Sequence, residues 1–339
     1  MNYMLKDENS IYYECGYSCD NAIYLSLGSE AFFITDGRYT IDATASVQNA
    51  TVITASDIYQ KALEIINQSH IKKLIFDPKE WSVYGFDKIS SQTKVKLKPK
   101  IDFSHKKRII KSSQEIEFIQ KAVKLGAKAF NNLAQEIRKG GFGEDEYSLT
   151  YQAKASLSGY GKYDISFEPI VAINANAAKP HATPTKSKLH KDDLLLVDAG
   201  LKYKRYCSDR TRTVLANKYM TFDTHQRFKS KKIQKAYDTV LKAHDKAIKK
   251  ARSGMSAKEI DAIARGVIDK AGFGKYFVHS TGHGVGLDIH EMPYISTKSD
   301  TIIQDGMVYT VEPGIYIEGE FGIRIEDMVV MQNGKAVVL

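Results

Sequence analysis

With 339 residues, the chain exceeds the roughly 250–300 residues that one hydrophobic core spans, so two domains are expected. Its composition, 43% hydrophobic and 26% charged, excludes a largely disordered chain. Lys and Arg number 49 against 40 Asp and Glu, which gives a net charge of +9. The lysines are scattered and not interleaved with aromatic residues. This favours a solvated surface, and we expect no nucleic-acid partner.

Membrane insertion and secretion are not predicted. The longest uninterrupted aliphatic run, Leu194–Val197, is far shorter than the ~20 residues of a membrane span. No basic-then-apolar leader is present near the start. The cysteines, Cys15, Cys19 and Cys207, are too few and odd in number for a disulfide framework. We therefore expect a reduced, cytoplasmic protein.

The first hundred residues alternate between strand-like and helix-like patterns, which predicts a mixed α/β domain. The expected helix covers residues 57–68, and the expected strands cover 22–27, 31–35, 52–54, 73–76 and 94–97. A basic stretch at 104–111 follows without strong periodicity. Ser112 and Glu115 then have capping-box spacing before a long amphipathic pattern. We place the domains at 1–108 and 109–339.

The second domain contains a faint internal repeat. The segment Gly159–Tyr163 returns as Gly272–Tyr276, 113 positions later, and Val197–Gly200 returns as Val311–Gly314 after 114 positions. Two helices are expected before each copy, at 116–139 with 145–157 and at 225–251 with 257–270. We predict two related α+β halves that face each other.

Acids follow strongly apolar runs in both halves. Asp198 ends the run at 194–197, and Glu312 ends the run at 308–311. A buried acid costs several kcal/mol unless it is paired or binds a metal. Both positions are therefore candidate ligand sites.

Each of these acids has a second acid downstream. Asp209 follows Asp198 by eleven residues, and Glu326 follows Glu312. The simpler interpretation is local pairing, of Asp209 with Arg210 or Arg212 and of Glu326 with Arg324. Convergence of all the acids on one pocket is the alternative.

Three histidines lie within twelve residues: His279, His283 and His290. Glycines flank His283 on both sides, which suggests close approach of another group. His181 lies in a loop-like stretch upstream. Four converging carboxylates require positive charge, and carboxylates with imidazole suit Mn²⁺, Co²⁺, Fe²⁺ or Zn²⁺.

These motifs resemble the pita-bread metallopeptidases, which include methionine aminopeptidase, aminopeptidase P and prolidase. The five matching metal ligands are Asp198, Asp209, His283, Glu312 and Glu326. The segment Thr35–Tyr39 resembles the strand-end motif of the creatinase/prolidase N-terminal domain. The resemblance implies an α/β domain of that type followed by a pita-bread catalytic domain with pseudo-twofold halves, an α+β fold overall.

The resemblance also implies roles. Asp209 and Glu326 bridge two divalent ions, Mn²⁺ in first place, and Glu312 also serves as general acid/base. His290 and His181 match substrate-side histidines. His279 matches a pocket histidine, and Arg324 matches an arginine that orients a bridging acid.

The implied activity is removal of the N-terminal residue from peptides with proline in second position, with a metal-bridged water as nucleophile. An Xaa-Pro dipeptidase is the alternative. Hydrolysis of a non-peptide amide and a non-catalytic binding module on the same fold are more remote. A peptide substrate and a possible homodimer are the expected partners.

Overall fold

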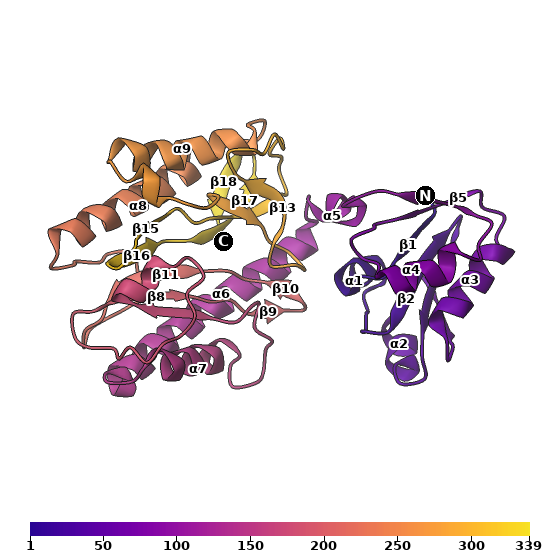
Figure 1. Ribbon diagram of the computed structural model, residues 1–339, viewed down its shortest axis with the longest axis horizontal. Coiled ribbons are helices and arrows are strands. Elements are labelled where there is room, and N and C mark those ends of the chain that lie inside the picture. The colour runs from indigo at the N-terminus through magenta and orange to yellow at the C-terminus, as the bar shows by residue number, and fades with distance from the viewer. The chain divides into compact units, whose positions relative to one another are not determined.

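The computed structural model describes residues 1–339 and divides into two compact units, Met1–Arg108 and Ile109–Leu339 (Figure 1). Its three cysteines are free and buried. None of the helices combines the length and the hydropathy that a membrane span requires.

The first unit is built on a six-stranded mixed sheet in the order β4-β3-β2-β1-β5-β6. Successive apolar side chains of its strands point to opposite faces of the sheet, and each face packs into its own hydrophobic core. Met4 and Leu25 lie in the core with α3 and α4, while Leu5 and Tyr24 lie in the core with α1, α2 and α5. The strands are β1 (Tyr3–Leu5), β2 (Ala22–Leu27), β3 (Glu30–Thr35), β4 (Thr51–Thr54), β5 (Lys73–Phe76) and β6 (Lys96–Pro99). The helices are α1 (Glu8–Cys15), α2 (Thr40–Ser46), α3 (Ile58–Gln68), α4 (Val83–Ser90) and α5 (Phe103–Arg108).

The predicted strands at 22–27 and 73–76 are confirmed, and so is the helix at 57–68, where Asp57 is the N-cap. The last strand begins at Lys96, two residues after the expected start, because it pairs in parallel with β5 from Lys73 onward. The sequence analysis missed β1, α1, α2, α4 and also α5, which lies in the stretch described as lacking periodicity. A strand of three residues and helices of six to eight are too short for a clear periodicity.

Glu80 gives the first unit a pH-dependent stability. Burial and the charge of Asp7 raise the pKa of Glu80 to about 7, although its carboxylate accepts hydrogen bonds from the Ser10 hydroxyl and the Lys6 amide. Since the unfolded carboxyl titrates near pH 4.5, the unfolded state binds fewer protons between the two values. The free energy of unfolding therefore falls as pH rises through this window, by about 3 kcal/mol at most.

Glu80→Gln is expected to raise the unfolding free energy of this unit at pH 8 and to change it little at pH 4.5. Urea unfolding at both pH values measures the difference. Glu30→Gln, at an exposed position of β3, is the control. An equal effect of Glu80→Gln at both pH values would contradict the prediction.

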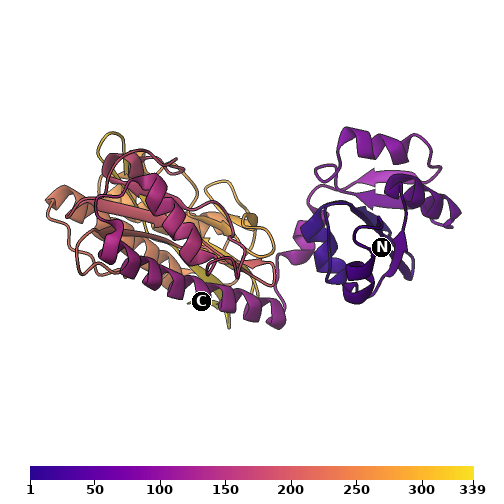
Figure 2. The same cartoon turned by 90° about the horizontal axis from the view of Figure 1, so that it is seen from below.

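The second unit has two halves, each with a helix pair outside antiparallel strands (Figure 1). One half holds the sheet β11-β8-β7 and the other holds β13-β12-β14-β17-β18. Figure 2 shows α6 running along the length of this unit. The helices are α6 (Ser113–Glu136), α7 (Glu146–Leu157), α8 (Lys231–Lys250) and α9 (Ala257–Lys270). The strands are β7 (Ile170–Ile173), β8 (Leu194–Asp198), β9 (Lys202–Tyr203), β10 (Tyr206–Cys207), β11 (Thr211–Leu215), β12 (Gly282–Gly284), β13 (Glu291–Ile295), β14 (Val308–Val311), β15 (Gly314–Ile317), β16 (Phe321–Arg324), β17 (Asp327–Gln332) and β18 (Lys335–Val338).

Strand β8 is buried on both faces, which explains its continuous apolar run. Leu195 and Val197 pack into the core formed with α6 and α7, while Leu194 and Leu196 pack into the core formed with α8 and α9. The strand thus lies between the two helix pairs and delivers its last residue to the middle of the unit.

Both predicted capping boxes are present, Ser112 with Glu115 on α6 and Ser256 with Glu259 on α9. Helix α8 begins at Lys231 and not at 225, because the Ser230 side chain caps it by accepting from the Ile233 amide.

Candidate active site

Asp198 and Asp209 are brought together by the pairing of β8 with β11. Asp198 is the last residue of β8 and lies opposite Thr211, the first residue of β11. The short hairpin of β9 and β10 connects the two strands and leads into Asp209. Arg212 instead contacts the Asp327 carboxylate at 2.6 Å, and Arg210 lies over the Phe130 ring. The simpler alternative, local pairing of Asp209 with Arg210 or Arg212, is therefore not what the structure has.

Glu312 and Glu326 occupy corresponding places in the other half. Glu312 directly follows β14, and Glu326 lies between β16 and β17. Strands β14 and β17 pair antiparallel, with Val311 opposite Asp327, so the two glutamates emerge at the same end of the sheet. The Glu326 carboxylate accepts a hydrogen bond of 2.6 Å from the Thr211 hydroxyl of the first half.

His283 lies on β12, where two glycines permit close packing of the neighbouring strands. A Cβ on Gly282 would lie 1.9 Å from the Thr310 carbonyl oxygen, and one on Gly284 would lie 2.2 Å from the Met292 carbonyl oxygen. The His283 Nδ1 lies 3.1 Å from the Gly284 carbonyl, which can only accept, so Nδ1 is the donor. Nε2 therefore points to the acids.

The side chains from both halves form one buried cluster. His283 Nε2 lies 3.3 Å from Glu312 Oε1 and 3.6 Å from Asp209 Oδ2. Ligand atoms of Asp209, His283 and Glu326 lie within 4.8 Å of one another. Asp198 is 8% exposed and Glu326 is 1% exposed. The structure thus brings the five predicted ligand residues to one place.

The acids of this cluster oppose one another's ionisation. Burial and the charges of Glu326 and Asp198 raise the pKa of Asp209 well above its ordinary value. Burial and Glu312 raise the pKa of Glu326 in the same way. Glu312 differs because contact with His283 outweighs burial and lowers its pKa to about 2. Full ionisation of all four acids requires added positive charge.

Divalent metal ions fit this donor set. The Oδ1 atom of Asp198 is buried and has no hydrogen-bond partner, which is costly for a carboxylate unless a cation lies beside it. The other Asp198 oxygen accepts from Arg324 Nη2 at 2.6 Å. Carboxylates with one imidazole suit hard or borderline ions.

A pocket of about 460 Å³ opens onto the cluster. His290 and His181 line it, and the His290 ring centroid lies 4.3 Å from that of His283. Burial followed by the charge of His283 lowers the pKa of His290. Among the pocket's wall residues are Phe167, Ile170, Pro180, Ile289 and Tyr294.

His279 also lines the pocket, but both its ring nitrogens are engaged. Nδ1 donates to the Ser280 carbonyl at 2.7 Å, and Nε2 accepts from the Tyr316 hydroxyl at 2.8 Å. Burial lowers the pKa of His279. The imidazole is therefore neutral and fixed, which suits a positioning role.

Arg324 is the hub of the surrounding hydrogen bonds. Nη1 donates to the Tyr316 hydroxyl at 2.7 Å, and Nε donates to the Thr211 hydroxyl at 3.0 Å. The guanidinium pairs with Asp198 and not with Glu326, so the simpler alternative of an Arg324–Glu326 ion pair is not present. The hydrogen bonds that connect Arg324 to Glu326 run through the Thr211 hydroxyl. Sequence reasoning missed Thr211 and Tyr316, since no local pattern marks them.

Comparison with known families decides the identity of this fold. Residues 2–105 match the Creatinase/Prolidase N-terminal domain, and residues 117–333 match metallopeptidase family M24. The chain belongs to metallopeptidase family M24.

Individual M24 relatives cover nearly the whole chain. The Xaa-Pro dipeptidase of Pyrococcus horikoshii is 32% identical over 330 residues, 96% of this chain and 88% of that protein. The solved Xaa-Pro dipeptidase from Bacillus anthracis has a TM-score of 0.91 at 29% identity, covering 99% of this chain and 92% of its own. An X-Pro aminopeptidase from Thermotoga maritima has a TM-score of 0.88 at 30% identity, covering 99% and 94%.

These comparisons confirm the expected fold, a creatinase-type N-terminal domain and a pita-bread catalytic domain. They also show that the protein is a metallo-exopeptidase of the M24 family, which implies divalent metal ions.

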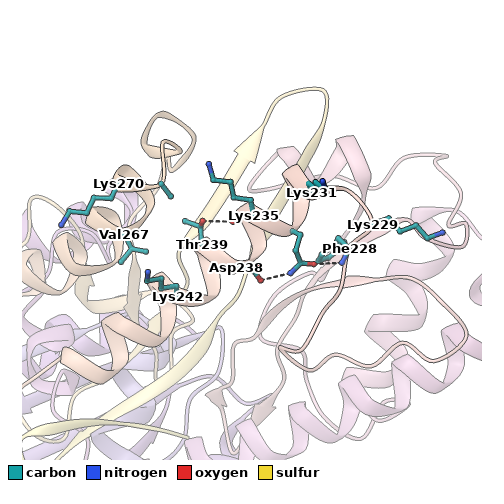
Figure 3. Close-up of a pocket in the computed structure, with 11 residues that line it drawn as sticks. Phe228, Lys229, Lys231, Lys235, Asp238, Thr239, Lys242, Val267 and Lys270 are labelled. Carbon is teal, nitrogen blue, oxygen red and sulfur yellow. Dashed lines mark hydrogen bonds between the residues drawn. The ribbon is translucent and has the colours of Figure 1, made fainter.

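A second hollow, of about 640 Å³, lies between α8 and α9 of this M24 peptidase (Figure 3). None of the predicted site residues lines it. Its lining includes five lysines and one acid, Asp238, and Lys229 pairs with Asp192. The hollow lacks the clustered acids and histidines that metal-dependent hydrolysis needs. The lysines that line it are Lys229, Lys231, Lys235, Lys242 and Lys270.

Glu146 is another residue that the sequence analysis missed. It is fully buried at the start of α7, and its carboxylate accepts from the Ile173 amide, the Asn176 side chain, and the amide and hydroxyl of Thr185. These donors lie on both sides of His181 in the sequence. Glu146 therefore ties down the loop that carries this histidine.

Glu146→Gln is expected to lower the free energy of unfolding by about 2 kcal/mol, because the amide nitrogen would face a buried donor. Urea unfolding measures the loss. Glu117→Gln, at an exposed position of α6, should change stability little. Equal effects of the two substitutions would show that the Glu146 contacts contribute no stability.

Proposed function

We propose that this M24 metallopeptidase is an Xaa-Pro dipeptidase, and we assign catalysis to residues 109–339. The observation that carries the proposal is the buried cluster of Asp209, His283 and Glu326 at the floor of a pocket. Full-length relatives named Xaa-Pro dipeptidase support the substrate class. Their names favour the dipeptidase, which was the alternative in the sequence analysis, over the aminopeptidase.

In this proposal, Asp198, Asp209, His283, Glu312 and Glu326 hold two divalent ions, with Mn²⁺ preferred. Such ions supply Lewis-acid polarisation of the scissile carbonyl and lower the pKa of a water. His283 presents Nε2 because its Nδ1 donates to the Gly284 carbonyl. Arg324 fixes Asp198 through the 2.6 Å contact with Oδ2.

Glu312 is the proposed proton acceptor. Contact with His283 lowers its pKa, and the charge of bound ions would also favour the ionised form, so at neutral pH the carboxylate can take a proton from the attacking water. The Thr310 hydroxyl, 3.2 Å from Glu312 Oε1, helps to hold the carboxylate in place. Glu312 then delivers that proton to the departing proline nitrogen.

The proposed role of His290 and His181 is hydrogen bonding to the substrate. Arg324 is the only Arg or Lys that lines the pocket. Its guanidinium already donates hydrogen bonds to Asp198, Tyr316 and Thr211. The two imidazoles are therefore the proposed partners of a substrate carbonyl oxygen and of the carboxylate of a dipeptide, beside the hydroxyls of Ser280 and Tyr294 that also line the pocket. A prolyl imide has no N–H, so a pocket that receives it needs no acceptor for one.

An X-Pro aminopeptidase is the second candidate, because the Thermotoga maritima enzyme of that name has the same fold over 99% of this chain. Hydrolysis of Ala-Pro and of a longer peptide beginning Ala-Pro, by metal-stripped protein reloaded with Mn²⁺, Co²⁺ or Zn²⁺, separates the two. Cleavage of the dipeptide alone supports the proposal. Efficient cleavage of the longer peptide supports the aminopeptidase. Cleavage of neither substrate by protein that binds metal contradicts both.

A further inference from the structure

A buried ion pair joins two distant parts of the catalytic unit beside the proposed site. Lys111 Nζ contacts Glu291 Oε1, and the two side chains are 1% and 2% exposed. Lys111 lies just before the N-cap of α6, and Glu291 is the first residue of β13. Glu291 directly follows His290.

The backbone on the Lys111 side is anchored. The Lys111 amide donates to the Gly306 carbonyl at 2.8 Å, and the neighbouring Ile110 forms an isolated bridge with Met307. These residues precede β14, the strand that leads to Glu312. Lys111 is therefore fixed to the framework of the site by its backbone as well as by its side chain.

The Glu291 carboxylate packs against the loop between β12 and β13. A Cβ on Gly286 would lie 2.6 Å from Glu291 Oε1, so the carboxylate occupies the space that a side chain at 286 would fill. Gly284 pairs with Glu291 in the β12–β13 ladder. Glu291 thus packs against the start of this loop from its C-terminal end, in the position directly after His290.

His290 depends on this loop for its position. Its ring makes an edge contact with the His283 ring and has no hydrogen-bond partner in the protein. Since no side-chain hydrogen bond orients the ring, the backbone at 290–291 decides where it lies.

We propose that Lys111 is a positioning residue for the peptidase reaction, acting through Glu291 to hold His290 over the metal-binding cluster. This inference rests on the proposed function of His290 in substrate binding. Removal of one partner leaves a buried charge without compensation, which forces Glu291 and its loop to move. A displacement of about 1 Å near reacting groups is enough to cost about 100-fold in rate.

A double-mutant cycle with His290 distinguishes positioning from general stabilisation. If Lys111 acts through His290, Lys111→Met should lower kcat/KM about 100-fold in the wild-type background and less than about threefold beside His290→Ala. Additive losses would overturn the proposal. Metal content and circular dichroism identify variants that fail to fold. Glu291→Gln, which removes the charge of the other partner, can replace Lys111→Met in a second cycle with His290→Ala. Lys258→Met, which breaks the exposed pair with Asp300, is the matched control and should leave kcat/KM unchanged.

An activity-free measurement separates this inference from the proposed function. In metal-free protein labelled with ¹⁵N-histidine, His290→Ala identifies the ring resonances of His290. Lys111→Met should shift or split these resonances and leave those of His70, in the first unit, in place. An unchanged His290 signal would overturn the proposal even if the wild type cleaves Xaa-Pro peptides. A shifted signal would support the positioning role even if it cleaves none.

Discussion

Glu312→Gln is expected to lower kcat by about 10²- to 10⁴-fold, because the amide cannot take a proton from the attacking water. Glutamine is nearly isosteric and keeps one oxygen that can face a metal ion. The contact with His283 Nε2, 3.3 Å in the wild type, can also be kept by that oxygen. Metal binding should therefore fall much less than turnover.

Steady-state kinetics with Ala-Pro, together with metal analysis after gel filtration, tests this expectation. Glu318→Gln, at an exposed position just after β15, is the matched control and should behave as the wild type. Near-normal turnover by Glu312→Gln would remove Glu312 from the role of proton acceptor. Loss of metal in parallel with activity would restrict its role to that of a ligand.

Arg324→Met is expected to destabilise the metal-free protein by about 3–5 kcal/mol, the usual cost of leaving a buried charge unpaired. Asp198 would lose its 2.6 Å partner, and Tyr316 and Thr211 would each lose a hydrogen bond. Bound divalent ions replace part of the missing positive charge. The loss should therefore be smaller in the metal-loaded protein than in the stripped protein.

Urea unfolding of wild type and variant, with EDTA and with Mn²⁺, measures both values. Arg252→Met is a matched control, since Arg252 is exposed and its guanidinium donates to the Lys249 and Ala251 carbonyls. An equal loss of stability with and without metal would show that Arg324 and the ions do not share the charge compensation of the cluster.

Two acids of the candidate site have a local signature in the sequence, whereas Asp209 and Glu326 were assigned only through the family resemblance. Asp198 and Glu312 end apolar strands, and burial of such residues is too costly without a partner. Two capping boxes were equally readable, since both members of each lie within three residues. The repeat that relates the two halves was also visible in the sequence, because its motifs return in the same order after 113 and 114 positions.

The partners of those residues were not predictable in the same way. Arg324 lies two residues from Glu326 in the sequence but pairs with Asp198, which is 126 positions away. Strand pairing decides this choice, because it places Asp198 and Thr211 opposite each other and brings β16 beside them. The alternation of apolar and polar residues along a strand predicts which side chains share a face, but it does not predict which strand pairs with it.

The sequence by itself led to the expectation of two domains, and the resemblance of its motifs to a known family supplied the fold class and five metal-binding candidates, because motifs are residue types at fixed local spacings. Only the tertiary structure decided which side chains orient the site. Lys111 and Glu291 are 180 positions apart, and Glu146 accepts hydrogen bonds from residues 27 to 39 positions later. Such contacts arise from chain topology and burial, which impose no periodic signal on the sequence, so they became visible only once the packed core was known.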